Sequence, residues 1–97
     1  MTEHEQKDRS FSTEKLKQIG PGFVERVSKA TLDSLLFKLH QCGAITSAEE
    51  EYIGAANQRS EKAKRLFDTV TKKGVSSLLM KNLKDEDPFL YQELCLM

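Results

Sequence analysis

The sequence has few cysteines, no excess of charge of either sign and no long apolar run, and each shortage excludes a class of protein. Two cysteines among 97 residues, Cys42 and Cys95, cannot hold together a disulfide-rich scaffold, although a single disulfide between them stays open. Basic and acidic residues number 15 each, so the formal net charge is zero. Zero net charge disfavours a protein that coats nucleic acid. No stretch approaches the roughly 20 apolar residues that a membrane span needs.

The N-terminal segment is polar and lacks the apolar run of a secretion signal. We expect residues 1–12 to form a flexible tail and residues 13–97 to form one helical domain in the cytoplasm. A chain of this length buries about two-thirds of its unfolded surface, which leaves little room for a deep pocket. We therefore expect neither a membrane partner nor a small-molecule substrate.

Candidate catalytic and metal-binding residues are sparse. Beside the two cysteines, the only further good metal donors are His4 and His40, which do not complete a four-ligand set. His40 and Cys42 superficially suggest a thiolate–imidazole pair, but residues two apart on a helix point to different sides. No third group is present to orient such a pair. We predict no enzymatic activity, no metal and no cofactor.

The apolar residues recur at the spacing of a helix. Leucine occurs twelve times, whereas valine and isoleucine together occur seven times. Leu32, Leu35, Leu36 and Leu39 form one stripe at i, i+3, i+4 and i+7. Similar stripes along the chain predict six short helices, at 13–29, 31–42, 47–56, 60–73, 75–84 and 88–95.

The stripes together predict one hydrophobic core. Its members are Leu16, Ile19, Phe23, Val27, Leu32, Leu35, Leu36, Leu39, Ile53, Leu66, Phe67, Val70, Leu79, Leu83, Leu90 and Leu94. Phe37 falls off its stripe, and we expect it to be partly exposed.

Start and stop signals support these boundaries. Thr46-Ser47-Ala48-Glu49 is a capping box, and Asp87-Pro88 combines a good N-cap with a proline at the first helical position. Ser60 is expected to cap the fourth helix. Gly43 and Gly74 follow stripes at places that suit a left-handed C-terminal cap.

The first helix carries an interruption. Gly20-Pro21-Gly22 lies between apolar residues that keep helical spacing, and Pro21 removes the hydrogen bond to the carbonyl of Lys17. We predict a helix that is kinked or broken at this segment.

Six segments of the chain carry a resemblance to a known family. They are Phe23-Val24-Glu25-Arg26-Val27, Leu32-Asp33-Ser34-Leu35-Leu36, Gly43-Ala44-Ile45-Thr46, Lys62-Ala63-Lys64-Arg65-Leu66-Phe67-Asp68, Lys73-Gly74 and Asp87-Pro88-Phe89-Leu90. Over residues 13–96 this pattern resembles the caspase recruitment domain (CARD) of the death-fold superfamily, and most of all the CARDs of inflammatory caspases and of CARD-only or inflammasome proteins. The resemblance implies an all-α, six-helix antiparallel Greek-key bundle. Several members carry more basic residues in the first helix, where this chain has only Lys15 and Lys17 before the glycine–proline–glycine segment.

The resemblance also implies a function. CARDs bind other CARDs, which recruits caspases and assembles inflammasome or apoptotic signalling complexes, often by helical oligomerisation. We therefore expect other CARD proteins and copies of this chain as partners. One alternative is a CARD-only decoy that caps partner filaments and inhibits signalling. An alternative from another class is a small nucleic-acid-binding domain that uses the basic helix 60–73.

Charge is unevenly distributed along the chain. Residues 59–73 hold six basic and two acidic side chains, a net charge of +4, while Glu49, Glu50 and Glu51 form an acidic run. By the family's mode of association, the basic face would contain Arg26, Lys62, Lys64 and Arg65. The acidic face would contain Asp33, Glu49, Glu50 and Glu51.

These charges also have a plainer interpretation, because charged runs are often only solvated faces. Glu61 precedes Arg65 by four residues and Asp68 precedes Lys72 by four, which favours pairs within the helix. If the faces do associate, Arg65→Glu should abolish association while barely changing stability.

Overall fold

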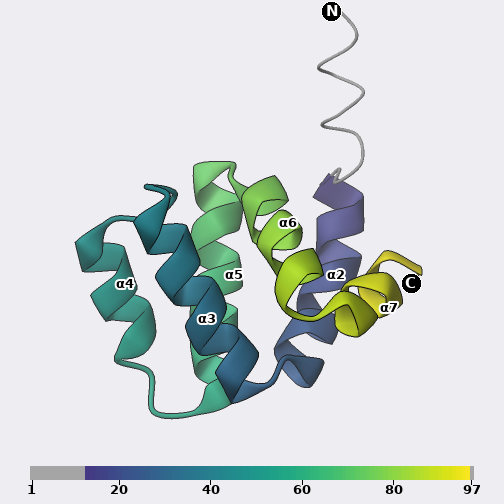
Figure 1. Cartoon of the computed structure of the whole chain (residues 1–97), viewed down its shortest axis with the longest axis horizontal. Coiled ribbons are helices and arrows are strands. Elements are labelled where there is room, and N and C mark those ends of the chain that lie inside the picture. Colours follow the sequence, from purple (N-terminus) through teal and green to yellow (C-terminus); the bar gives the residue numbers. More distant parts are fainter. Residues whose placement is uncertain (1–12, 97) are drawn as a thin grey trace, which may run out of the picture.

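The computed structural model describes residues 13–96, which form six α-helices and no strand (Figure 1). The helices are α2 (Thr13–Arg26), α3 (Lys29–Gln41), α4 (Ser47–Gly54), α5 (Arg59–Lys73), α6 (Ser76–Glu86) and α7 (Pro88–Leu96). The predicted all-α class and helix count are confirmed over this part of the chain. Each boundary falls within three residues of the sequence-based one. The predicted tail, residues 1–12, lies outside the described residues.

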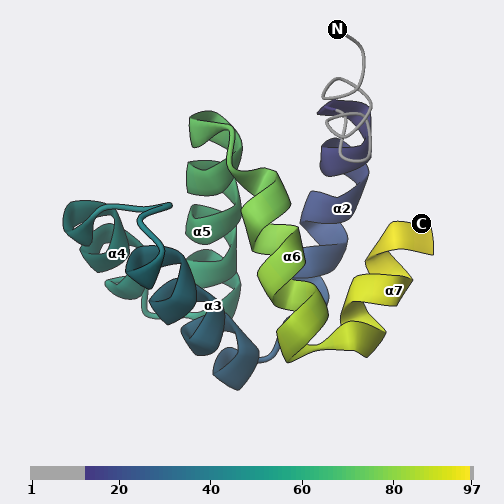
Figure 2. The same cartoon turned by 45° about the horizontal axis from the view of Figure 1, so that its top comes forward.

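Successive helices alternate in direction, so the chain folds back on itself at every short connection (Figures 1 and 2). Helix α4 lies at one end of the bundle, beyond α3 and α5, and α7 lies at the other end (Figures 1 and 2). Helix α5 packs against α2, α4 and α6, while α3 packs against α6. This arrangement is consistent with the six-helix death fold that the resemblance implies.

Helix α2 is not broken at the glycine–proline–glycine segment, although a break was one of the two predicted outcomes. It runs without a break through Pro21 to Arg26, and the non-helical interruption falls at residues 27–28 instead. Ile19 and Phe23 are fully buried on either side of Pro21, whose ring lies on the exposed side of the helix. Packing of this apolar face outweighs the hydrogen bond that proline removes.

Two of the predicted N-caps are present. The Thr46 hydroxyl accepts a hydrogen bond from the amide of Glu49 at 3.1 Å, and the Glu49 carboxylate accepts one from the amide of Thr46 at 2.8 Å. The Asp87 carboxylate accepts from the amide of Leu90 at 3.1 Å. These bonds satisfy amides at the starts of α4 and α7 that have no partner within their helices.

The C-terminal end of α5 matches its prediction, and the N-terminal end does not. Gly74 follows the helix with φ of 74° and Gly43 follows α3 with φ of 82°, the left-handed backbone that glycine adopts without strain. Ser60, however, is not the N-cap. The helix begins at Arg59, and its N-cap Gln58 makes no side-chain capping bond.

Arg59 hydrogen-bonds to the backbone at the end of α2. Its Nη1 donates to the carbonyl oxygens of Val24 at 2.7 Å and Val27 at 2.9 Å. Val24 lies in the last turn of α2 and Val27 directly follows the helix, where carbonyls have no intrahelical donor. The first residue of α5 therefore caps the end of a helix more than 30 positions earlier in the chain.

The core matches the predicted stripes closely. Every predicted member is buried except Leu16, which is partly buried against the rest. The rings of Phe23 and Phe67 lie 5.8 Å apart between α2 and α5. Burial of each large apolar side chain stabilises the bundle by about 1.5–3 kcal/mol. The prediction missed four buried hydrophobic residues: Ala44, Ile45, Ala63 and Met80.

Candidate protein-interaction surface

Helix α5 turns one face to the core and the rest of its circumference outward. Ala63, Leu66, Phe67 and Val70 are buried along the inner face. The rotation of the helix about its axis leaves Lys64 exposed. Residues on either side of the buried face are half-buried. The four residues of the predicted basic face therefore differ in how accessible they are.

Lys62 is held within the molecule. Its Nζ lies 3.0 Å from Oδ1 of Asp33 on α3, and only 16% of its side chain is exposed. Lys29 contacts the other oxygen of Asp33 at 3.3 Å. These hydrogen bonds, that from Lys62 foremost, hold the pKa of Asp33 below its usual value. Lys62 and Asp33, predicted on opposite faces, are thus neighbours where the two charged surfaces meet.

Arg65 is also engaged. Its Nη1 donates to the backbone carbonyl of Tyr52 at 2.6 Å, and its guanidinium carbon lies 4.6 Å from the centre of the Tyr52 ring. The predicted pair with Glu61 is confirmed at 3.3 Å, and 26% of the Arg65 side chain is exposed. Arg65→Glu would remove three contacts at once, so the structure gives a physical reason to expect a larger loss of stability than the sequence did.

Arg26 lies apart from the other three cations. It ends α2 and pairs with Glu93 of α7 at 3.2 Å, with both side chains largely exposed. An exposed pair of this kind contributes about 0–1 kcal/mol to stability and is screened by salt. Arg26 can therefore exchange Glu93 for another carboxylate at little cost.

Two of the three acidic residues on α4 also contact side chains of the same chain. Glu49 contacts Lys73 of α5 at 2.6 Å in addition to its capping bond. The hydrogen bond from Lys73 is the main reason why the pKa of Glu49 lies below its usual value. Glu50 lies 3.5 Å from Nδ1 of His40, whereas Glu51 is exposed.

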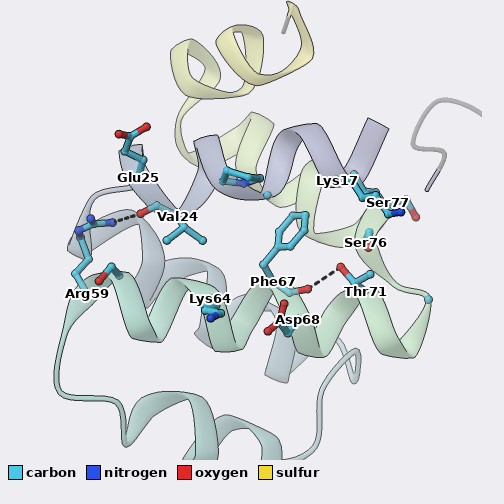
Figure 3. A pocket seen from close by; sticks show the side chains of 15 residues that line it. Lys17, Val24, Glu25, Arg59, Lys64, Phe67, Asp68, Thr71, Ser76 and Ser77 are labelled. Carbon is cyan, nitrogen blue, oxygen red and sulfur yellow. Dashed lines mark hydrogen bonds between the residues drawn. The ribbon is translucent and has the colours of Figure 1, made fainter. Parts of the chain in front are cut away.

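A groove of about 1190 Å³ runs between α2 and α5 (Figure 3). Its floor is apolar, and Phe67 points into it from α5 toward α2. Gly20 lines the same floor, and a Cβ at this position would lie 3.0 Å from the Phe67 ring. Charged side chains border the groove: Lys17 and Glu25 from α2, and Arg59, Lys64 and Asp68 from α5.

Sequence reasoning missed this groove. It treated Gly20 as part of an interruption, whereas the glycine allows close approach of two helices. The only local sign of this close approach was that Gly20 directly follows a residue of the apolar stripe. Its partner Phe67 lies 47 positions further along the chain.

Among the described residues, His40, Cys42 and Cys95 make separate contacts. His40 contacts Ser47 through Nε2 at 3.1 Å, while the thiol of Cys42 is placed to donate to the carbonyl of Leu39. Cys42 and Cys95 are free thiols, one exposed and one half-buried. Within residues 13–96 no group of three or more side chains could hold a metal ion.

A groove with an apolar floor and a charged border resembles the apolar centre and polar rim of protein-interaction surfaces. The comparison with family models is specific: the model described as the caspase recruitment domain matches residues 13–96. This chain belongs to that family, whose members are homotypic protein–protein interaction modules. Comparison with curated proteins and with solved structures gave no match. No helix in the described part is long and apolar enough to cross a membrane.

Proposed function

We propose that this domain binds other caspase recruitment domains and copies of itself through oppositely charged surfaces. In a cell it would recruit caspases or inflammasome and apoptotic partners in the cytoplasm. The observation that carries the proposal is the position of two exposed charges. Lys64 on α5 and Glu51 on α4 form no ion pair within residues 13–96, although many neighbouring charges are paired.

The geometry favours open assembly. The basic surface, defined as Lys17, Lys64 and the flanking Arg26, Lys62 and Arg65, lies on α2 and α5. The acidic surface, defined as Asp33, Glu49, Glu50 and Glu51, lies on α3 and α4. A contact between two different surfaces of one chain leaves a free copy of each at the ends, so it can continue as a helical filament.

The test compares charge reversals at exposed sites. Lys64→Glu should weaken self-association at least tenfold, because repulsion across an interface costs several kcal/mol while an exposed substitution leaves the fold intact. Glu51→Lys should do the same from the acidic side. Mixing the two variants should restore association in part. Light scattering and electron microscopy measure assembly, and circular dichroism checks folding.

A matched control separates local contact from general charge. Lys81 is an exposed lysine on α6, a helix that contributes no residue to either surface, and Lys81→Glu changes the net charge equally. It should associate like the unaltered protein. Unchanged assembly by folded Lys64→Glu would refute the basic surface. If the unaltered protein shortens the filaments of a partner domain instead of joining them, it is a capping decoy.

The nucleic-acid alternative loses support from the ion pairs on α5. Lys62, Arg65 and Lys73 are each held by a carboxylate of the same chain. Binding a phosphate backbone would require these pairs to break, which lowers the electrostatic gain that drives such binding.

A further inference from the structure

Tyr52 occupies an unusual position for a large aromatic side chain. It lies on α4 with 55% of its surface exposed, and it is the only exposed large apolar residue between 13 and 96 that carries a hydroxyl group. The only other tyrosine in the sequence, Tyr91 on α7, is half-buried against the core. The two tyrosines therefore differ sharply in how easily a second protein can reach them.

A cation is already in contact with the Tyr52 ring. The Arg65 guanidinium lies over the ring at 4.6 Å from its centre, and Nη1 is bonded to the Tyr52 carbonyl. Arg65 therefore lies beside the ring that would carry a phosphate, with Nε bonded to Glu61 and Nη1 bonded to the Tyr52 carbonyl. A guanidinium is the side chain best suited to bind a phosphate through two parallel hydrogen bonds.

The residues before Tyr52 are acidic. Glu49, Glu50 and Glu51 occupy the three positions that precede it, and none of the three is buried. A tyrosine kinase whose substrate groove is basic selects acidic residues at these positions by charge complementarity. No acidic residue occupies the three positions before Tyr91, where the sequence reads Pro88-Phe89-Leu90.

Helix α4 can open locally. It has eight residues and one buried side chain, Ile53, and non-helical segments at 42–46 and 55–58 flank it. An element with few buried contacts opens at a lower free energy than the rest of the domain. Such opening lets Tyr52 enter a kinase cleft in an extended conformation while α2, α3, α5 and α6 stay packed.

We propose that Tyr52 is a tyrosine phosphorylation site whose phosphate is bound by Arg65. A kinase transfers the γ-phosphoryl group of ATP: a bond forms between the phenolic oxygen and γ-phosphorus, and the bond to the β,γ-bridging oxygen breaks. ADP leaves, and the phenolic proton passes to the kinase's base. The product adds a charge of about −1.5 to −2 beside Arg65. It ties α4 to α5 by a charge-assisted bond.

This inference goes beyond the proposed function and has one consequence that rests on it. Arg65 belongs to the basic surface, so a phosphate that binds Arg65 withdraws that cation and places negative charge at the edge of α5. Phosphorylated protein should then self-associate more weakly than unmodified protein. The site itself is tested on dilute, unassociated protein, so its failure is distinguishable from failure of the proposed function.

The first experiment locates the phosphate. The purified chain is incubated with MgATP and a soluble tyrosine kinase of the class that prefers acidic residues before tyrosine, and phosphopeptides are mapped by mass spectrometry. We expect incorporation at Tyr52 at least tenfold faster than at Tyr91. Tyr52→Phe should abolish most incorporation and Tyr91→Phe should leave it unchanged. Preferential modification of Tyr91, or of neither tyrosine, would overturn the site.

The second experiment tests the role of Arg65. Hydrogen exchange of the α4 amides is compared before and after phosphorylation, in the unaltered chain and in Arg65→Gln. A charge-assisted bond between α4 and α5 should slow exchange about tenfold in the unaltered chain. Within Arg65→Gln, phosphorylation should give no such slowing, whatever that substitution does by itself. Equal slowing in both proteins, or none in the unaltered chain, would show that Arg65 does not bind the phosphate.

Discussion

The Lys62 ammonium group lies 3.0 Å from the Asp33 carboxylate, which joins α5 to α3 across the side of the bundle. One member belongs to the basic surface and the other to the acidic surface. The two surfaces therefore share a border, at which charges neutralise one another inside a single chain. Charges further from this border, such as Lys64, are available to a second molecule.

Lys62 and Lys64 should separate stability from association. Lys62→Glu places two anions together and should lower the free energy of unfolding by about 0.5–1.5 kcal/mol, given that most of the Lys62 side chain is covered. Lys64→Glu should stay within about 0.5 kcal/mol of the unaltered protein. Urea denaturation of both variants measures the difference. Equal stability of the two would mean that the ion pair contributes nothing in solution.

Truncation of two adjacent residues on α3 should lower stability by very different amounts. Leu36 is 8% exposed within the core, whereas Phe37 is 56% exposed. Leu36→Ala should lower the free energy of unfolding by about 2–5 kcal/mol, through lost burial and the cavity left behind. Phe37→Ala should cost under about 1 kcal/mol. Thermal and urea unfolding test both, and a loss below about 1 kcal/mol for Leu36→Ala would contradict its place in the core.

Arg59→Ala should destabilise the domain although the residue is not in the apolar core. Its removal leaves the carbonyls of Val24 and Val27 without their charged donor, at a cost of about 1.5–3 kcal/mol. Lys at this position keeps the charge but has a shorter side chain that ends in a compact ammonium group, so Arg59→Lys should recover only part of the loss. If Arg59→Ala unfolds at the same denaturant concentration as the unaltered protein, water replaces the guanidinium without penalty.

Acid should weaken the contact between α4 and α5. The pKa of Glu49 is lowered in the folded domain by the hydrogen bonds from Lys73 and from the Thr46 amide, while in the unfolded chain it returns to its usual 4.5. The stabilising contribution is thus present above pH 4.5 and is lost as the pH falls through the lowered folded value. NMR titration of Glu49 measures this pKa directly. Lys73→Gln should raise it, and an unchanged titration would show that Lys73 is not its partner.

The core and the local caps could be predicted from the sequence because both depend on short-range spacing. The stripe through Leu32 and Leu39 and the capping box at Thr46 and Glu49 each act within two turns of one helix. The position of Pro21 could not be judged in this way. Whether a helix continues through proline depends on the tertiary packing of Ile19 and Phe23, which no local pattern measures.

Much of the candidate site depended on long-range contacts. The sequence predicted that Lys62 and Arg65 were accessible, since charged residues on helices usually are. Their partners Asp33 and Tyr52 lie on other helices. Which residues meet Lys62 and Arg65 therefore depends on how α5 packs against those helices. The pairing of Glu61 with Arg65, in contrast, followed from a separation of four residues and was predicted.

The bond from Arg59 to the end of α2 also has a consequence for the order of folding. The donor lies 32 and 35 positions after its two acceptors, so during synthesis α2 leaves the ribosome before the residue that completes its C-terminal end. Helices α3 and α4 emerge in the interval. The carbonyls of Val24 and Val27 therefore gain their donor only when α5 docks, which couples the end of α2 to the packing of the second half of the bundle onto the first.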